Sequence, residues 1–159
     1  MMGKILNLPN DKLRQLASGC LLHDIGKLFV DPKVGDREYQ IRQHCILGYE
    51  LLRRCEQSEL LSPFVAYEHH EHQDGSGLPR GLKGSNALKR DRAVTTPIPT
   101  VVGEIAAIAD AYDNLVSGTW GAPPLPVEEA LKTIYDQAGT RYNAEIVKSL
   151  RRVVPIFPQ

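Results

Sequence analysis

The chain has 159 residues, and its 19 Lys and Arg residues are balanced by 19 Asp and Glu residues, so the formal net charge at pH 7 is zero. This length suits one domain, and 42% hydrophobic with 24% charged residues argue against wholesale disorder. Zero net charge excludes a global attraction to polymeric nucleic acid or to an anionic membrane, so an anionic ligand would need a local arrangement of binding groups.

The cellular context is predicted from what the sequence lacks. No apolar run approaches the roughly 18 residues of a membrane span, and the N-terminus has no signal-peptide core, so we expect a cytoplasmic protein without a membrane segment. Cys20, Cys45 and Cys55 are odd in number and form no C-x-x-C pair. We therefore expect small buried hydrophobic residues on helices, not disulfides or a thiolate zinc site.

Helical periodicity begins early in the chain. Apolar residues at three- and four-residue spacing predict a first helix from Asn10 to Leu28, with His23 and Asp24 near its C-terminal end. After a turn at residues 31–35, a second helix over residues 41–52 carries His44 on its inward face. A third helix, entered at Ser62 and Pro63, ends with the adjacent residues 69 and 70, both histidines.

The second half of the chain continues in helices after one long interruption. Residues 73–98 are rich in glycine and proline without sustained periodicity, which predicts a long functional loop. A fourth helix is expected to open at Ile98-Pro99 and to carry Asp110 on or beside its apolar face. Further helices are predicted over residues 127–137 and 144–153. Strand signals are nearly absent, so we expect residues 1–159 to form a single all-α helical bundle.

Histidines and carboxylates occur on four of these predicted helices, in a combination typical of transition-metal ligands. The candidate ligands are His23, Asp24, His44, His69, His70 and Asp110. Six such groups exceed what one ion needs, so we expect two divalent metal ions bridged by Asp24. One ion would be completed by His44, His69 and His70. The other would be held by His23 and Asp110. Any one of these histidines alone is more often a core or surface residue, and only the joint pattern favours metal.

A two-metal site of this kind can activate water for attack on phosphorus, so the predicted chemistry is phosphate ester hydrolysis with Asp24 at its centre. Lys27 lies one turn after Asp24 and is a candidate catalytic and phosphate-binding residue, with an ordinary surface lysine as the competing interpretation. Arg80 and Lys83 are candidate substrate-binding cations. His72 is expected to face solvent. Glu71 could hydrogen-bond a ligand histidine or lie at a solvated helix end.

Four segments carry a family resemblance: LLHDIGK at 21–27, HCILG at 44–48, HHEHQDGSGLPRGLKG at 69–84 and IAAIADAYDNL at 105–115. Together they resemble the HD-GYP family of the HD phosphohydrolase superfamily. The resemblance implies an HD-type helical bundle that hydrolyses cyclic di-GMP, to the linear dinucleotide or GMP, in bacterial second-messenger signalling. It also implies iron or manganese on the six ligands named above and a phosphate contact at Lys27. The family's motif loop corresponds to Asp74, Gly75, Gly77, Leu78 and Pro79.

The sequence departs from the family pattern in four places. Leu78 stands where the family has tyrosine, and no additional histidine precedes the first motif, so one metal would lack a ligand or the chain is an excised part of a longer polypeptide. Residues 117–124 contain no basic residue, although the family has an arginine-rich stretch there. The loop at 85–96 carries Lys89, Arg90 and Arg92, which could substitute for that stretch or be solvated.

These departures leave two alternative functions open. One is a degenerate, non-catalytic signalling or binding module on the same scaffold, and the other is an HD hydrolase of a different phosphoester. The partners expected from the resemblance are a cyclic dinucleotide substrate and a signalling protein or a preceding sensor or receiver domain. A homodimer is a further possibility.

Overall fold

The computed structural model describes residues 1–55, 62–88, 97–119 and 122–154, and it confirms the prediction of an all-α fold. The described residues contain no β-strand, only the isolated bridges Asp74↔Lys83 and Ala138↔Tyr142. No helix in these ranges is long and apolar enough to cross a membrane. In chain order the elements are α1 (Met2–Ile5), α2 (Asn10–Leu22), the 3-10 helix η1 (Ile25–Phe29), α3 (Arg37–Arg54), α4 (Ser62–Glu68), α5 (Val101–Ser117), α6 (Val127–Asp136) and α7 (Ala144–Val153).

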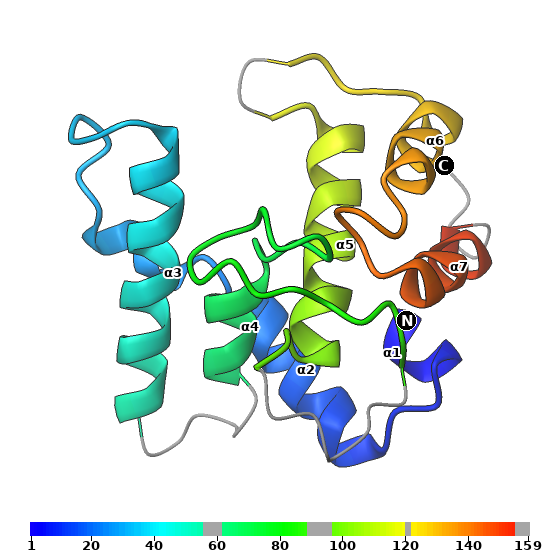
Figure 1. Cartoon of the computed structure of the whole chain (residues 1–159), viewed down its shortest axis with the longest axis horizontal. Coiled ribbons are helices and arrows are strands. Elements are labelled where there is room, and N and C mark those ends of the chain that lie inside the picture. The colour runs from blue at the N-terminus through cyan, green and yellow to red at the C-terminus, as the bar shows by residue number, and fades with distance from the viewer. Residues whose placement is uncertain (56–61, 89–96, 120–121, 155–159) are drawn as a thin grey trace.

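Helix α5 lies at the centre of the molecule, with α3 and α4 on one side and α6 and α7 on the other (Figure 1). Its sequence is the most apolar of the long helices, which suits burial on several sides. The core against α5 is formed by fully or nearly fully buried side chains of α4, α5, α6 and α7, including Val65, Ile105, Ile108, Ile134, Ile146 and Leu150. Because α4 and α5 contact each other in this core, the segment after α4 is placed beside the middle of α5.

Side-chain caps set the start of three helices. The Thr100 hydroxyl accepts a hydrogen bond from the Gly103 amide at 3.2 Å, so α5 begins at Val101 and not at the predicted Ile98-Pro99. The cap is Thr100 and not Pro99, because only threonine has a side-chain oxygen that can accept this hydrogen bond. Asp36 caps α3 by accepting from the Tyr39 amide at 2.8 Å, and Asn143 caps α7 in the same way.

The first predicted helix is wrong at its C-terminal end. Helix α2 stops at Leu22, and η1 follows as a separate element, so that Leu21 and Leu28 are 85% and 76% exposed instead of lying on one apolar face. The reason is the close packing of η1 on α3. A Cβ added to Gly26 would lie 2.0 Å from the His44 carbonyl oxygen. Only glycine permits this approach, and it brings the His23-Asp24 turn against the middle of α3.

Three further points concern the cysteines, the N-terminal helix and the cations of the long loop. Among the cysteines only Cys45 is buried, whereas Cys20 is half-buried and Cys55 is exposed just after α3. The short helix α1 was not expected from the sequence. Lys89, Arg90 and Arg92 of the long loop lie outside the described residues.

Candidate metal centre

The predicted ligands come together from four places in the fold. His23 and Asp24 lie in the turn between α2 and η1, His44 lies in the middle of α3, and Asp110 lies in α5. The two remaining histidines follow directly after α4, which ends at Glu68. The imidazole rings of the cluster lie close together: the ring centroids are 4.1 Å apart for His69 and His70 and 4.9 Å apart for His23 and His69. The structure therefore gathers the whole predicted set around one point.

Each of three imidazoles is oriented by the helical turn that precedes it. The Nδ1 atoms of His23, His44 and His69 lie 2.8, 3.0 and 3.0 Å from the carbonyl oxygens of Cys20, Gln40 and Ala66, respectively. A carbonyl oxygen can only accept, so Nδ1 carries a proton and donates it. This leaves the Nε2 atom of each ring as the atom that faces the cluster. The arrangement is the usual one for metal-binding histidines, whose second nitrogen is held by a backbone carbonyl.

Asp24 lies between the imidazoles. One carboxylate oxygen, Oδ1, is 3.4 Å from His44 Nε2 and 3.7 Å from His69 Nε2. The other, Oδ2, is 3.3 Å from His23 Nε2 and 2.5 Å from the Lys27 ammonium. Oδ1 is buried and accepts no hydrogen bond from any described residue. A buried carboxylate oxygen without a hydrogen bond is costly unless a cation binds it, so this atom fits a metal ligand.

The spacing of the ligand atoms also fits a metal ion. The Nε2 atoms of His44 and His69 are 3.4 Å apart, which is close to the roughly 3.3–3.4 Å separating two nitrogens that lie about 2.0–2.1 Å from one tetrahedral ion. The candidate ligand atoms form two groups that share His69, and within each group all atoms lie within 4.8 Å of one another. One group also contains His23 and Asp24, and the other also contains His44, Cys45 and His70. The cluster could therefore hold a metal ion.

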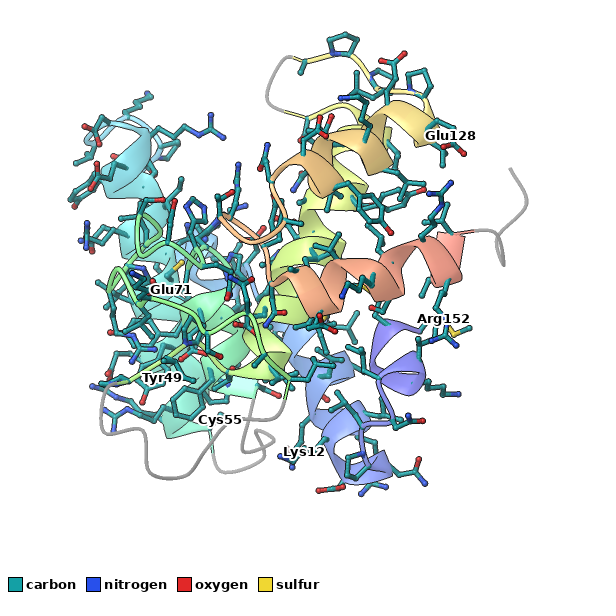
Figure 2. All side chains as sticks on the ribbon, turned by 45° about the vertical axis from the view of Figure 1, so that its right-hand side comes forward. Lys12, Tyr49, Cys55, Glu71, Glu128 and Arg152 are labelled. Atoms are coloured by element: carbon teal, nitrogen blue, oxygen red, sulfur yellow. The ribbon has the colours of Figure 1, made fainter. Side chains whose placement is uncertain are left out.

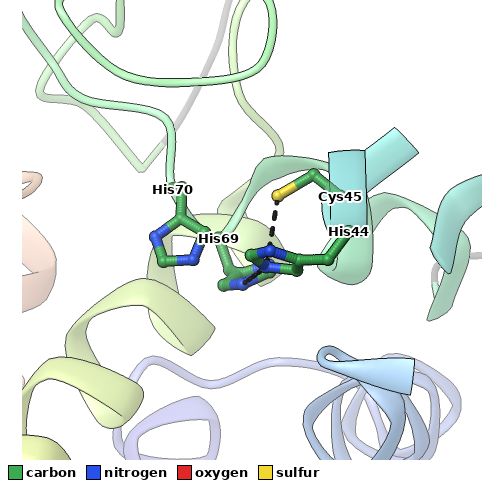
Figure 3. Close-up of side chains that lie close together, drawn as sticks. All are labelled: His44, Cys45, His69 and His70. Atoms are coloured by element: carbon green, nitrogen blue, oxygen red, sulfur yellow. Dashed lines mark hydrogen bonds between the residues drawn. The ribbon is translucent and has the colours of Figure 1, made fainter. Parts of the chain in front are cut away.

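Cys45 is the residue of this cluster that sequence reasoning missed. Its Sγ lies 3.6 Å from His44 Nε2 (Figure 3), and its side chain is fully buried. Burial raises the pKa of the Cys45 thiol, and the negative charge of Asp24 raises it further, so the thiol is protonated at neutral pH. The only sequence signal was its place next to His44, which by itself is also typical of a core residue.

The carboxylates charge His23 when no cation is present. Burial lowers the pKa of His23, but hydrogen bonds to Asp110 and Asp24 outweigh burial and raise the pKa to about 10. The Nε2 atom of His23 is 3.5 Å from Asp110 Oδ1, so the ring lies between two carboxylates. In Asp24, His23 and Lys27 outweigh burial and hold the pKa well below its usual range. The His23 imidazolium and the Lys27 ammonium balance the carboxylates of Asp24 and Asp110, so a metal ion bound here would take the place of the His23 proton.

The other histidines are neutral. Burial lowers the pKa of His69 to about 4 and that of His70 to about 2, and the neighbouring histidines add to both shifts. Burial also lowers the pKa of His44. A metal binds the neutral imidazole, so these three rings are ready to bind without first losing a proton.

The cluster opens into a cavity of about 1010 Å³. His44, His69, His70 and Asp110 contribute to its wall, and Lys27 lies at the same cavity. The opposite wall comes from α5, from α6 and from the α6–α7 connection. A cavity of this size lies at the upper end of the range for small-molecule sites, about 300–1000 Å³.

The motif loop after His70 is held by Glu71, which fits neither of its two predicted roles. Its buried carboxylate accepts hydrogen bonds from the backbone amides of Arg80 and Leu82, at 2.8 and 2.6 Å, so it closes the loop on itself. Figure 2 shows Glu71 within this loop. Gly77 packs so tightly that an added Cβ would lie 2.2 Å from the His72 amide nitrogen. The loop is thus a compact support for the two histidines that precede it.

The remaining motif residues take structural positions. The Asp74 carboxylate accepts from the Ser76 amide and hydroxyl, and the Leu78 amide donates to the His70 carbonyl at 2.9 Å. Gly75 has φ +85°, a conformation that favours glycine. The Pro79 carbonyl accepts from Arg42 of α3, which ties the loop to that helix.

Arg80 and Lys83 were predicted to bind substrate, but neither is among the described residues that line the cavity. The Arg80 guanidinium donates to Glu68 at 2.5 Å and lies 4.5 Å from the centre of the Tyr67 ring, so its charge is satisfied within the fold. Lys83 pairs through its backbone with Asp74 and is exposed. His72 is half-buried, lines the cavity and hydrogen-bonds Ser76 at 2.9 Å, and is thus not fully directed to solvent. The local sequence gave no signal for these long-range partners.

Comparison with known proteins places this geometry in a family context. Residues 1–146 match the family described as HD domain. The chain is 35% identical over 141 residues to a cyclic di-GMP phosphodiesterase of Thermotoga maritima, covering 83% of this chain and 35% of that protein. It is 28% identical over 161 residues to the cyclic di-GMP phosphodiesterase response regulator RpfG of Xanthomonas campestris, covering 96% of this chain and 39% of that protein.

A solved structure has the same fold. The crystal structure of a cyclic GMP-AMP specific phosphodiesterase of Vibrio cholerae, V-cGAP3, superposes with a TM-score of 0.71 at 20% sequence identity. The match covers 97% of this chain and 41% of that chain. This chain thus spans well under half the length of each of these three proteins.

Proposed function

Because the chain belongs to the HD domain family, we propose that it acts as a metal-dependent phosphodiesterase on a cyclic dinucleotide, with cyclic di-GMP as the first candidate substrate. The observation that carries this proposal is the convergence of three anchored imidazoles on the Asp24 carboxylate, whose Oδ1 is buried and accepts no hydrogen bond from any described residue, at the wall of a large cavity. The names of the two relatives support the choice of substrate.

The proposed cofactor is a pair of divalent metal ions, with iron or manganese as first candidates. His44, His69 and His70 would hold one ion, His23 and Asp110 the other, and Asp24 would bridge them. Imidazole and carboxylate ligands suit these metals, whereas magnesium prefers a site made of oxygen ligands alone. Bound there, the ions would polarise a phosphoryl oxygen and lower the pKa of a water molecule.

The protein's own side chains have separate tasks in this proposal. Asp24 holds Lys27 at 2.5 Å, and this pairing keeps the ammonium beside the cluster, where it can neutralise a substrate phosphate. The carbonyl contacts of the three Nδ1 atoms keep the rings in one orientation during turnover. The apolar residues of α5 that line the cavity, such as Ala107 and Ala111, limit the water around the bound substrate.

The test is to load the purified protein with iron or manganese under reducing conditions and to offer it cyclic di-GMP. Metal content from elemental analysis and product from chromatography are both measured, with His69→Ala as the site variant and Asp113→Asn as a control outside the ligand set and the cavity. We expect metal-dependent cleavage that is lost with His69→Ala and retained with Asp113→Asn. Absence of both metal and turnover would refute the proposal.

The same experiment separates the alternatives. Stoichiometric cyclic di-GMP binding without hydrolysis, unaffected by His69→Ala or Asp110→Ala, would indicate a non-catalytic binding module. Turnover of a different phosphoester in a substrate panel at fixed metal, without turnover of cyclic dinucleotides, would indicate another HD hydrolase. The cyclic GMP-AMP specificity of the solved structural relative makes that dinucleotide the second member of the panel.

A further inference from the structure

The cavity has room and walls beyond the metal cluster. A cyclic dinucleotide contains two phosphodiester groups in one ring, so a substrate with one group at the cluster presents the second elsewhere in the cavity. That second group carries a full negative charge, and removing it from water is costly unless a cation meets it. The cavity of about 1010 Å³ should therefore contain a cation apart from the metal site.

The cations of the cavity are few and unevenly distributed. Among the described residues that line it, Lys27, Arg37 and Arg141 carry permanent positive charges. Lys27 is held by Asp24 at 2.5 Å and thus belongs to the cluster. Arg37 lies in the first turn of α3. On the whole wall formed from α5 onward, Arg141 is the only cation among the described lining residues.

The segment between α5 and α6 does not supply this charge. Its described lining residues are Thr119, Ala122, Pro123 and Leu125, which are neutral. A phosphate on that side of the cavity would meet only uncharged groups from this segment. Arg141, from the next connection along the chain, faces the same cavity and is exposed. None of the ion pairs found among the described residues involves Arg141.

The backbone around Arg141 is fixed to the motif loop. The Gln73 amide donates to the Arg141 carbonyl at 3.2 Å, and the Asp74 amide donates to the Thr140 carbonyl at 2.8 Å. In Figure 1 this α6–α7 connection, in orange, reaches back toward the green loop that follows α4. The Arg141 guanidinium lies 5.4 Å from the centre of the buried Tyr142 ring. Because the same loop carries His69 and His70 at its start, Arg141 has a defined position relative to the cluster.

We propose that Arg141 binds the second phosphate of the cyclic dinucleotide and thereby selects two-phosphate substrates over simple phosphodiesters. This inference rests on the proposed function and adds a specificity-determining residue to it. Arginine suits the task because its planar guanidinium donates two parallel hydrogen bonds to phosphate oxygens and keeps its charge at all accessible pH values. The Tyr142 ring below it restricts the guanidinium and lowers the entropy lost on binding.

The test compares two substrates. Kinetics of Arg141→Ala, Arg141→Lys and the control Arg152→Ala are measured with cyclic di-GMP and with bis(p-nitrophenyl) phosphate, an activated diester with one phosphate. Arg152 is exposed on α7 and lies far from Glu71 in Figure 2. We expect Arg141→Ala to raise KM for cyclic di-GMP by about tenfold or more, as for loss of a charge-assisted hydrogen bond, and to affect the one-phosphate diester much less. Arg141→Lys should fall between, because it keeps the charge but not the two-pronged geometry.

Other outcomes decide against the inference or against the proposed function, and they can be told apart. Equal effects of Arg141→Ala on both substrates, or no effect on either, would overturn the inference while wild-type turnover upholds the proposed function. If the metal-loaded wild type cleaves neither substrate, the proposed function fails. In that case equilibrium binding of cyclic di-GMP decides the inference alone: a tenfold weaker affinity of Arg141→Ala supports it, and equal affinity overturns it. Unchanged metal content and near-ultraviolet circular dichroism verify that each variant is folded.

Discussion

Replacing Asp24 by asparagine is the sharpest test of the metal centre. The variant keeps the shape of the side chain but removes its negative charge, and its amide nitrogen would face either the imidazoles of His44 and His69 or the ammonium of Lys27. In the wild type both carboxylate oxygens face the cluster: Oδ1 lies 3.4 and 3.7 Å from the Nε2 atoms of His44 and His69, and Oδ2 lies 2.5 and 3.3 Å from Lys27 and His23. We therefore expect a loss of affinity at both proposed metal positions.

The size of this loss follows from electrostatics. Two unit charges about 4 Å apart interact by about 4 kcal/mol at an effective dielectric constant of about 20, and a divalent ion doubles this figure. Solvent reaches about a third of the Asp24 side chain, which is 34% exposed, and the carboxylate must be partly desolvated on binding, so we retain half of the doubled figure. A change of about 4 kcal/mol corresponds to roughly a thousandfold weaker metal binding.

The assay is calorimetric titration of the metal-free protein with manganese, combined with elemental analysis after dialysis. Asp113→Asn is the matched control, because Asp113 is an exposed carboxylate on α5 that does not line the cavity. Asp24→Asn should retain less than one ion per chain under conditions in which the control retains the wild-type amount. An unchanged stoichiometry and affinity in Asp24→Asn would refute the assignment of Asp24 as the bridge between two ions.

Three further predictions concern protonation, support of the motif loop and thiol access. Because the pKa of His23 is raised to about 10, metal binding at pH 7 to 9 should release about one proton from His23, and metal affinity should increase about tenfold for each unit by which the pH rises. Calorimetry in buffers of different ionisation enthalpy counts that proton, and His23→Gln should abolish its release. Glu71→Gln places an amide N–H against a buried backbone N–H and should lower the free energy of unfolding by about 2 kcal/mol, which corresponds to a Tm lower by roughly 4–8 °C. The control Glu128→Gln, on the exposed face of α6, should leave Tm unchanged in the same thermal unfolding measurement. Iodoacetamide at pH 8 should modify the exposed Cys55 within minutes and leave Cys45 unmodified until the protein unfolds, as mass spectrometry of the peptides would show; equal labelling of both thiols would contradict the burial of Cys45.

The sequence was informative where residue type and periodicity agreed. His44 and Asp110 lie within periodic helices, so their inward position followed from spacing, and the structure brings both to the cluster. It was misleading at the end of α2, because Leu21 and Leu28 keep helical spacing across a glycine. There, tertiary packing of Gly26 against the His44 backbone overrides the local pattern.

The roles of charged residues in the motif loop could not be read from the chain. Arg80 resembles a substrate-binding cation because it lies in a glycine-rich loop, yet its partner Glu68 is twelve positions earlier and on another element. Glu71 bonds backbone amides nine and eleven positions later. Such pairings depend on how the loop folds back, which leaves no periodic trace. Arg141 was likewise unremarkable in the sequence because its connection to the cavity depends on hydrogen bonds between distant loops.

The anchoring of His23, His44 and His69 to the carbonyl groups of their own preceding turns has an evolutionary consequence. The geometry of the proposed metal centre is set by the helical backbone and depends little on which side chains occupy the opposite wall. If the proposed function holds, substitutions in the α6–α7 connection can therefore alter which nucleotide is accepted without changing the histidine and carboxylate cluster. We expect divergence in ligand preference among relatives to concentrate on that wall.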